Sequence, residues 1–341
     1  MDLTTGYPFW LIKNGLPYTY PKLESSVQVD VAIIGGGISG ALTNYYLSKA
    51  GMDCLVVDAR TIGLGSTCAS TSLLQYELDN SLTELSEQIG FQKASRVYQL
   101  CSDSIDTLET ICLDIKFQDF DRNQSLYFAA TKKDNSWLKD EFEIRKRAGF
   151  GVQLLQQKEI EKKFGFKAPS AILSEQGATM NAYMFTHALH QASIKQGASV
   201  YDRSTVTHIS YKRSSVILQM KNGCQIKAKN IVNASGYEIT EFIEKKIVKL
   251  HSTYALVSEQ LGKKSLPWKN AVLWNTADPY LYIRQTNDNR IIVGGRDEEF
   301  FNPTKRDKMI KKKSLQLRHD FNKLFPDVEM IPEFSWTGTF G

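Results

Sequence analysis

The sequence predicts an α/β protein of two domains, one built on a parallel sheet and the other on an antiparallel sheet. Residues 29–34, 38–50 and 54–57 read as strand, helix and strand within about 30 residues, which is typical of a parallel βαβ unit. Short strands separated by turn residues dominate the second half and favour an antiparallel sheet there. A chain of 341 residues, 42% of them hydrophobic, can bury two cores.

Composition excludes several classes of protein. The net charge of +5 is spread along the chain, without the dense basic stripe that nucleic-acid binding requires. The five cysteines have no CxxC spacing, so neither a disulfide framework nor a metal site is expected. The amino terminus is acidic, and no apolar run approaches the roughly 18 residues of a membrane span. We therefore expect a cytoplasmic protein without an integral membrane segment.

The remaining elements follow from hydrophobic periodicity and turn signals. Helical patterns dominate residues 82–149, interrupted by a strand near 125–130, and a further helix is expected at 184–196. Asn302 is a plausible N-cap for a basic helix with Pro303 in its first turn, and Lys311, Lys312 and Lys313 should form a solvated face. The apolar segment 9–12 is expected to pack on its own fold. Further strands are expected at 199–201, 206–211, 216–220, 225–227, 251–257, 281–284 and 291–293, with a two-residue turn at 222–223.

A glycine turn between the first strand and helix carries the main chemical signal. Its residues are Gly35, Gly36, Gly37, Ile38, Ser39 and Gly40. Gly35 permits a tight turn, Gly37 lets the backbone approach a pyrophosphate, and Gly40 allows close contact between helix and sheet. Asp58 ends the second strand about twenty residues later, where a carboxylate can bind an adenosine ribose. This order of elements predicts a dinucleotide site, which by itself suits NAD, NADP or FAD.

The segment after Asp58 favours FAD. It begins with Ala59 and Arg60 and continues with small and hydroxylated residues that let backbone donors approach a cofactor, among them Ser66, Thr67, Ser70 and Thr71. A nicotinamide-binding domain usually continues with a helix at this point. The segment instead resembles the loop of the glycine/D-amino-acid oxidase-like FAD family that runs along the pyrophosphate towards the flavin.

Two later segments resemble the same family. Residues 231–236, which end in Ala234, Ser235 and Gly236, are similar to the strand that returns beside the cofactor, and the segment starting at Val206 is similar to the one near the adenine. Residues 280–297 resemble the hairpin of the substrate domain that ends in Gly-Gly-x-Asp. The resemblance covers nearly all of residues 5–341.

The resemblance also suggests where a substrate would bind. Strand alternation places Tyr280, Tyr282 and Arg284 on one face of the hairpin, with Leu281 and Ile283 on the other. Two phenols and a guanidinium could bind a substrate carboxylate, or they could form an ordinary sheet surface. On the preceding strand Tyr254 is a further candidate, whereas His251 is more plausibly structural and Trp268 and Trp274 belong to the core.

The resemblance implies a discontinuous, Rossmann-like FAD-binding domain at residues 1–88, 181–237 and 326–341, with an antiparallel substrate domain of the D-amino-acid oxidase type at 89–180 and 238–325. It implies oxidation of an amine or amino acid by hydride transfer to flavin N5, imine hydrolysis, and reoxidation by O2 or another acceptor. Two alternatives stay open: a dehydrogenase of a hydroxy acid or glycerol-phosphate-like substrate, and a non-catalytic FAD-binding subunit.

Family members usually continue beyond the position of Gly341, so we expect a truncated form whose FAD domain is incomplete. The family's carboxylate-binding arginine and the cysteine that attaches flavin in some members are not seen in this last segment. We therefore expect FAD to be bound non-covalently. The oligomeric state stays open.

Overall fold

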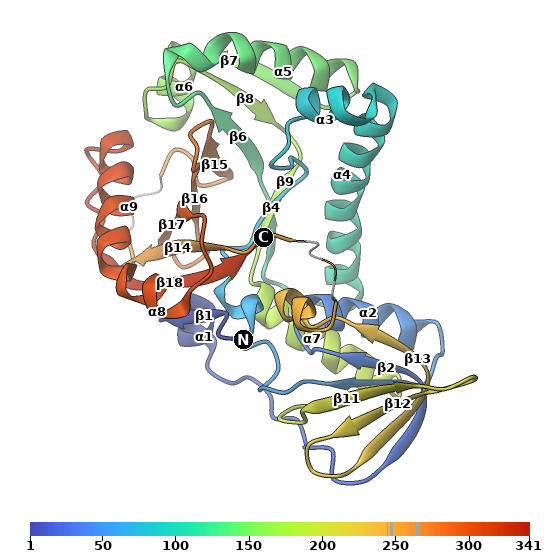
Figure 1. Ribbon diagram of the computed structural model, residues 1–341. Helices are drawn as coiled ribbons and strands as arrows, with labels where there is room; N and C mark the ends of the chain where they lie inside the picture. The colour runs from blue at the N-terminus through green and yellow to red at the C-terminus, as the bar shows by residue number, and fades with distance from the viewer. Residues whose placement is uncertain (244, 246–247, 263–265) are drawn as a thin grey trace.

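The predicted βαβ unit is present in the computed structural model, which describes residues 1–243, 245, 248–262 and 266–341. β2 (Val27–Ile34) and β3 (Cys54–Val57) pair in parallel, and α2 (Ile38–Lys49) connects them. They form the centre of a six-stranded sheet at the bottom of Figure 1, whose order is β10-β3-β2-β13-β12-β11. The other strands are β10 (Ser199–Tyr201), β11 (Val206–Tyr211), β12 (Val216–Met220) and β13 (Gln225–Asn233).

α7 (Ala182–Lys195) packs beside α2 on this sheet. Ala41 and Tyr45 of α2 share a buried cluster with Phe185 and Leu189 of α7. On the sheet itself, continuous apolar runs in β2 and β3 are buried on both faces, as expected for parallel strands.

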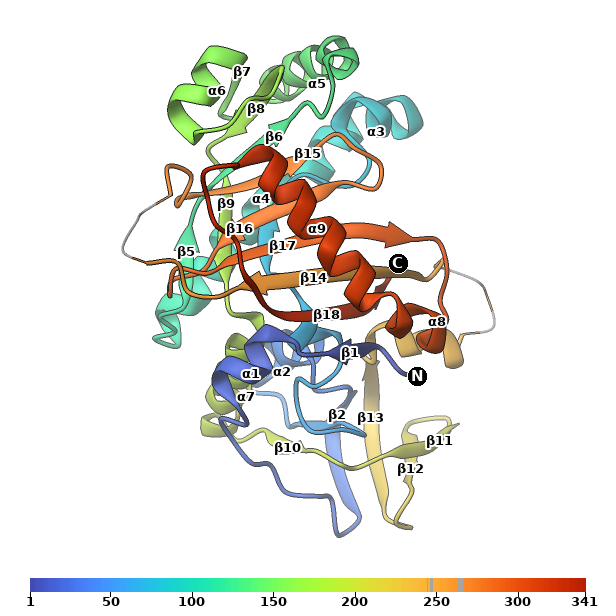
Figure 2. The same ribbon diagram turned by 90° about the vertical axis from the view of Figure 1, so that its left-hand side faces the viewer.

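A nine-stranded sheet forms the second lobe, in the order β1-β18-β14-β17-β16-β15-β6-β8-β7. Its neighbours pair antiparallel except for β15 and β6, which are parallel. The strands are β1 (Thr4–Gly6), β6 (Gln124–Phe128), β7 (Val152–Gln156), β8 (Ser170–Ser174), β14 (His251–Ser258), β15 (Ala271–Asn275), β16 (Leu281–Gln285), β17 (Ile291–Glu298) and β18 (Pro332–Phe340). α9 (Ile310–Leu324) crosses one face of this sheet (Figure 2).

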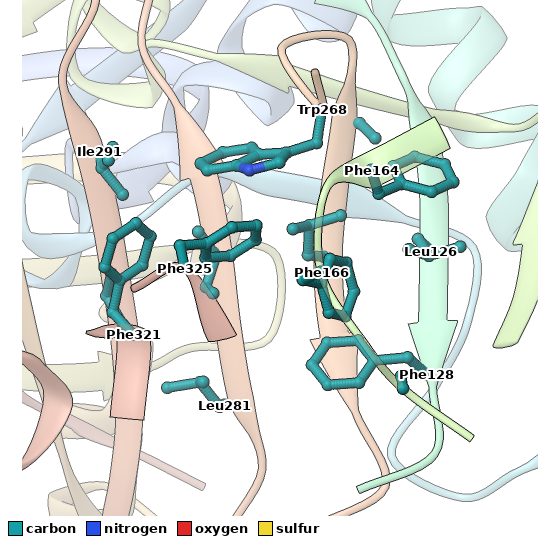
Figure 3. Packing of buried hydrophobic residues seen from close by; sticks show 14 of the residues in the cluster. Leu126, Phe128, Phe164, Phe166, Trp268, Leu281, Ile291, Phe321 and Phe325 are labelled. Atoms are coloured by element: carbon teal, nitrogen blue, oxygen red, sulfur yellow. The ribbon is translucent and has the colours of Figure 1, made fainter. Parts of the chain in front are cut away.

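The largest hydrophobic cluster lies between α9 and the nine-stranded sheet. Phe321 and the adjoining Phe325 pack against Trp268, while Phe166 links them to Phe128 on β6 (Figure 3). The opposite face of the sheet packs in part against Trp10, Cys68 and Tyr183 and in part against Leu138.

Short elements connect the two lobes. β4 (Leu73–Gln75), β9 (Gly177–Met180) and β5 (Phe120–Arg122) form a three-stranded sheet in the order β4-β9-β5, beside the long helix α4 (Phe91–Asp114) in Figure 1. The remaining helices are α1 (Phe9–Asn14), α3 (Leu82–Ile89), α5 (Asn135–Arg147), α6 (Gln157–Phe164) and α8 (Pro303–Lys308), with 3-10 turns η1 (Ser66–Ala69), η2 (Lys132–Asp134) and η3 (Gly236–Glu241).

Two predictions about the second lobe are wrong. Residues 326–341 were expected in the FAD domain, but β18 pairs with β14 and β1 in the nine-stranded sheet, where Trp336 packs against Val257. Lys313 was expected on a solvated face, but it is 6% exposed and its ammonium donates to the Arg296 carbonyl. Its position one helical turn from the buried Leu317 explains this, because both lie on the side of α9 that faces the sheet.

Several local predictions are confirmed. Asn302 caps α8 by accepting a hydrogen bond from the Lys305 N–H. Phe9 and Trp10 are buried in the fold, although Ile12 from the same apolar segment is exposed. Trp268 and Trp274 are both core residues, as expected.

The position of Phe321 generates a stability test. Phe321→Ala should lower the free energy of unfolding by about 3–5 kcal/mol, because it leaves a cavity beneath α9. Leu315→Ala on the same helix is the matched control, since Leu315 is 57% exposed and should change stability by about 0.5 kcal/mol or less. Chemical denaturation measures both, and equal losses would contradict the proposed burial of this face.

Candidate active site

The glycine turn closes the corner between β2 and α2 by backbone contact. Gly35 has φ +107°, and a Cβ there would collide with the Ala234 carbonyl; a Cβ on Gly40 would collide with the Gly35 carbonyl. Gly37 is different, because its φ of −76° suits any residue and the nearest atom to an added Cβ is Thr67 Oγ1 at 3.0 Å. Gly35 and Gly40 therefore shape the corner, whereas Gly37 keeps space open.

A cavity of about 780 Å³ surrounds this corner. The N-cap Gly37 has no side chain with which to cap α2, and the Ile38 N–H donates to Thr67 Oγ1 at 3.1 Å. Ile38 and Ser39 line the cavity, so the positive end of the helix dipole lies at its wall. The predicted residues on the cavity wall are Gly35, Gly37, Ile38, Ser39, Asp58, Ala59, Arg60, Ser66, Thr67, Ser70, Val206, Ala234, Ser235 and Gly236. Gly36 and Gly40 are not among the lining residues, because both are occupied in packing the corner.

Asp58 braces the turn as well as bordering the cavity. Its Oδ2 accepts a hydrogen bond from the Gly36 N–H at 2.7 Å, and its Oδ1 accepts one from the Arg60 N–H at 2.7 Å. Burial raises the pKa of Asp58, and these two backbone donors oppose the rise. Arg60 in turn forms an ion pair with Glu238 at 2.5 Å, so its guanidinium is already partnered.

The loop after η1 is fixed through four consecutive carbonyl groups. Trp336 Nε1 donates to the Ala69 carbonyl at 2.8 Å, and Trp10 Nε1 donates to the Ser70 carbonyl at 2.8 Å. Arg284 Nη1 lies 3.1 Å from the Thr71 carbonyl oxygen and 2.8 Å from that of Ser72. Donors from β18, α1 and β16 thus hold one loop segment, residues 69–72, in a single conformation.

A second cavity of about 340 Å³ adjoins the first and shares Ser66, Ser70 and Tyr237 with it. Tyr280 and Tyr282 form part of its wall, with ring centroids 5.9 Å apart. The two cavities therefore form one continuous site at the junction of the lobes.

The structure separates the three predicted substrate-binding residues. Tyr282 lines the second cavity, whereas Tyr254 is 1% exposed in the core beneath α9 and donates to the Arg306 carbonyl. Arg284 is 2% exposed and also lies 3.0 Å from the Met180 carbonyl oxygen, so it stands behind the loop instead of on a cavity wall.

Strand alternation nevertheless predicts the faces of β16 correctly. Leu281 and Ile283 point into the main core on the opposite side from Tyr282. Alternation assigns Arg284 to a face but says nothing of its partners, which lie more than 100 residues away in the chain.

Sequence reasoning missed several residues of the second cavity. Asp297, Thr253 and Tyr237 border it, although only Asp297 has a sequence signal, the two glycines that precede it by two and three residues. Burial raises the pKa of Asp297 to about 6, and the Thr253 hydroxyl opposes that rise. Trp10 and Trp336 were also missed, because no sequence motif near a tryptophan shows that its indole N–H donates to a carbonyl far away in the chain.

The fold and site define a dinucleotide-binding oxidoreductase with a second, sheet-walled cavity beside the nucleotide site. The family model described as DAO, FAD dependent oxidoreductase, matches residues 30–341. The chain belongs to this family of FAD-dependent enzymes. It is 25% identical over 339 residues to gamma-glutamylputrescine oxidoreductase of Escherichia coli, covering 94% of this chain and 76% of that protein.

Solved structures show the same fold. L-proline dehydrogenase from P. horikoshii superposes with a TM-score of 0.76 at 16% identity, covering 93% of this chain and 82% of that one. Glycine oxidase from Geobacillus kaustophilus has a TM-score of 0.75 at 18% identity, covering 92% and 82%. The architecture is accordingly of the type predicted, a Rossmann-like FAD-binding lobe joined to a lobe with a largely antiparallel sheet.

The residues present fit FAD in the larger cavity. Ser66 Oγ and Ser235 Oγ are buried on its wall and have no hydrogen-bond partner within the described residues. These hydroxyls, and the N–H groups of the first turn of α2 other than that of Ile38, are donors of the kind that a pyrophosphate accepts. Among the residues that the structure describes, no helix is both long enough and apolar enough to span a bilayer.

Gly37 provides a test of the cofactor cavity. Gly37→Val should abolish FAD binding, because the branched side chain would fill space between α2 and Thr67. Thr43→Val, further along α2, is the control and should retain the cofactor. The ratio of flavin to protein absorbance, with FAD identified after acid release, measures the effect. Stoichiometric FAD in Gly37→Val would show that the turn does not border the cofactor.

The contacts of Arg284 predict a structural effect. Burial lowers the pKa of Arg284 to about 10, so the guanidinium stays charged at neutral pH. Arg284→Lys should cost about 1.5–3 kcal/mol of stability, because an ammonium cannot reproduce the planar donor geometry. Arg213→Lys on an exposed turn is the matched control. Unfolding curves and steady-state kinetics on both variants decide: normal stability with impaired kcat/KM would instead favour a substrate-binding role.

Proposed function

We propose that this enzyme oxidises an amine or amino acid with non-covalently bound FAD. The observation that carries the proposal is the continuity between the nucleotide cavity and the smaller cavity walled by Tyr280 and Tyr282. A cofactor held along Gly37, Asp58 and Ser66 would direct its reactive end towards the residues that both cavities share. The similarity to gamma-glutamylputrescine oxidoreductase supports an amine among the candidate substrates.

When bound, FAD supplies the hydride acceptor for the carbon that carries the amine nitrogen. The chain contributes binding and orientation. Tyr282 lies on the cavity wall, and burial raises its pKa to about 12, so the phenol stays neutral and can donate a hydrogen bond. The residues of the smaller cavity would surround the reacting amine, which loses its ammonium proton before its carbon is oxidised.

Non-covalent attachment is supported by the positions of the cysteines. Among the described residues lining the two cavities there is no cysteine. Cys68 is the cysteine in the loop nearest both cavities, but it is buried in a hydrophobic cluster, and burial raises the pKa of its thiol to about 11. A thiol held neutral in this way is a poor nucleophile.

An anaerobic reduction experiment distinguishes this proposal from its alternatives. Addition of amines or amino acids to the purified yellow protein should bleach most of the visible flavin absorbance, because reduced flavin is the product. Air should then restore the absorbance if O2 is the acceptor. Bleaching only by glycerol phosphate or a hydroxy acid would support the dehydrogenase alternative. No bleaching by any of these compounds would favour a non-catalytic FAD-binding subunit.

A further inference from the structure

We infer that the smaller cavity binds a cationic alkylamine, with the Asp297 carboxylate as the partner of the ammonium group. This inference rests on the proposed function and narrows its substrate class from amines and amino acids to amines without a neighbouring carboxylate.

The first support is an unpartnered carboxylate oxygen. Asp297 lies on β17 at the wall of the cavity, where the Thr253 hydroxyl acts on its carboxylate. Its Oδ1 is nevertheless buried without a hydrogen-bond partner among the described residues. A buried ionised oxygen without a donor is costly, and a ligand that donates hydrogen bonds and carries positive charge removes that cost. A carboxylate or phosphate ligand would instead increase the cost of burying this oxygen, because its negative charge repels the Asp297 carboxylate.

The second support is the charge of the surrounding wall. The lining residues in the described part of the chain include no lysine or arginine, whereas the phenols of Tyr237, Tyr280 and Tyr282 all border the cavity. Aromatic faces attract an ammonium ion, and their hydroxyl oxygens can accept its N–H groups. Asp79 adds a second carboxylate nearby, since its Oδ1 accepts a hydrogen bond from the Tyr280 hydroxyl at 3.4 Å.

The cationic groups of Lys313 and Arg284 are engaged elsewhere. Lys313 Nζ on α9 donates to the Arg296 carbonyl at 2.7 Å and forms an ion pair with Glu298 at 2.6 Å. Arg284, which sequence alternation places on the same sheet face, is held by the carbonyls of the 69–72 loop segment. A carboxylate-bearing substrate would therefore find no free guanidinium or ammonium on the described wall.

Three isosteric probes test the inference on the FAD-loaded enzyme without turnover. They are tert-butylammonium, tert-butanol and pivalate, which share a shape but differ in charge. The carbon that bears nitrogen in tert-butylammonium has no hydrogen, so it cannot be oxidised. Calorimetry and the change in flavin absorbance on titration at pH 8 should show tert-butylammonium binding at least about tenfold tighter than both isosteres. Tighter binding of pivalate would overturn the inference.

Removal of the negative charge of Asp297 provides the second test of the inference. Asp297→Asn should weaken tert-butylammonium about tenfold or more and leave tert-butanol unchanged. Glu299→Gln, two residues away and exposed, is the matched control and should bind as the wild type does. FAD content and melting temperature confirm that each variant is folded. Unchanged ammonium binding by a folded, FAD-loaded Asp297→Asn enzyme would also overturn the inference.

The pH dependence of ammonium binding by the wild-type enzyme provides a third test, which needs no mutation. Asp297 is charged above its pKa of about 6 and neutral below it, so ammonium binding should weaken as the pH falls through 6. The probe itself stays protonated over this range, as aliphatic ammonium groups do below about pH 10. Asp79, His251 and Lys313 also act on Asp297. His251→Gln should keep the pH dependence, and loss of the dependence in that variant would contradict the inference.

Failure of the inference and failure of the proposed function give different results. An enzyme that is bleached by amino acids but prefers pivalate keeps the proposed function and refutes the cationic site. One that binds tert-butylammonium through Asp297 but is bleached by no amine or amino acid keeps the site and refutes the function.

Discussion

The four hydrogen-bonded carbonyls of the 69–72 loop segment are the constraint on which the rest of the site depends. Two indoles and one guanidinium donate to them from α1, β18 and β16, so both lobes and the amino-terminal helix meet at one stretch of backbone. A neutral hydrogen bond contributes about 0.5–1.5 kcal/mol and one to a charged group about 1.5–3 kcal/mol, so together they can fix a loop that its own sequence leaves flexible. Because Ser70 borders both cavities, fixing this loop also fixes how the cavities join.

A buried charge cluster includes a residue close in the chain to the wall of the smaller cavity. Arg145 on α5 pairs with Glu141 at 2.7 Å and with Glu77 at 3.2 Å, and all three side chains are almost completely buried. Burial raises the pKa of Glu77, while the Arg145 guanidinium opposes the rise. Such a cluster contributes little net stability, but removing one partner would leave a buried charge, which restricts how the surrounding chain can pack. Glu77 follows Gln75, a lining residue, by two positions, so this restriction reaches the cavity wall.

The sequence predicts what is local and fails where distant segments meet. The glycine turn, its strands and Asp58 lie within 30 residues or so, and the structure assembles them as expected. Arg284 was assigned to the right face but not to its partners, because hydrogen bonds to the Ser72 and Met180 carbonyls depend on the docking of two lobes. Residues 326–341 were expected in the FAD-binding domain for the same reason, because the sequence does not show which sheet edge a strand joins. Asp297 needed the register of β17 to be recognised as a wall residue.

The two cavities differ in the kind of group that they offer. The larger one presents donors, from the positive end of the α2 dipole to the hydroxyls of Ser66 and Ser235, and these match an anion. In the smaller one Asp297 presents an acceptor among phenols, which matches a cation. Their electrostatic preferences are opposite, so neither ligand should compete well for the other's cavity. A site with the proposed polarity would orient a dinucleotide and an amine towards the residues that both cavities share, before any chemistry begins. Orientation of the reactants is the main contribution of a protein to catalysis when the cofactor carries out the reaction.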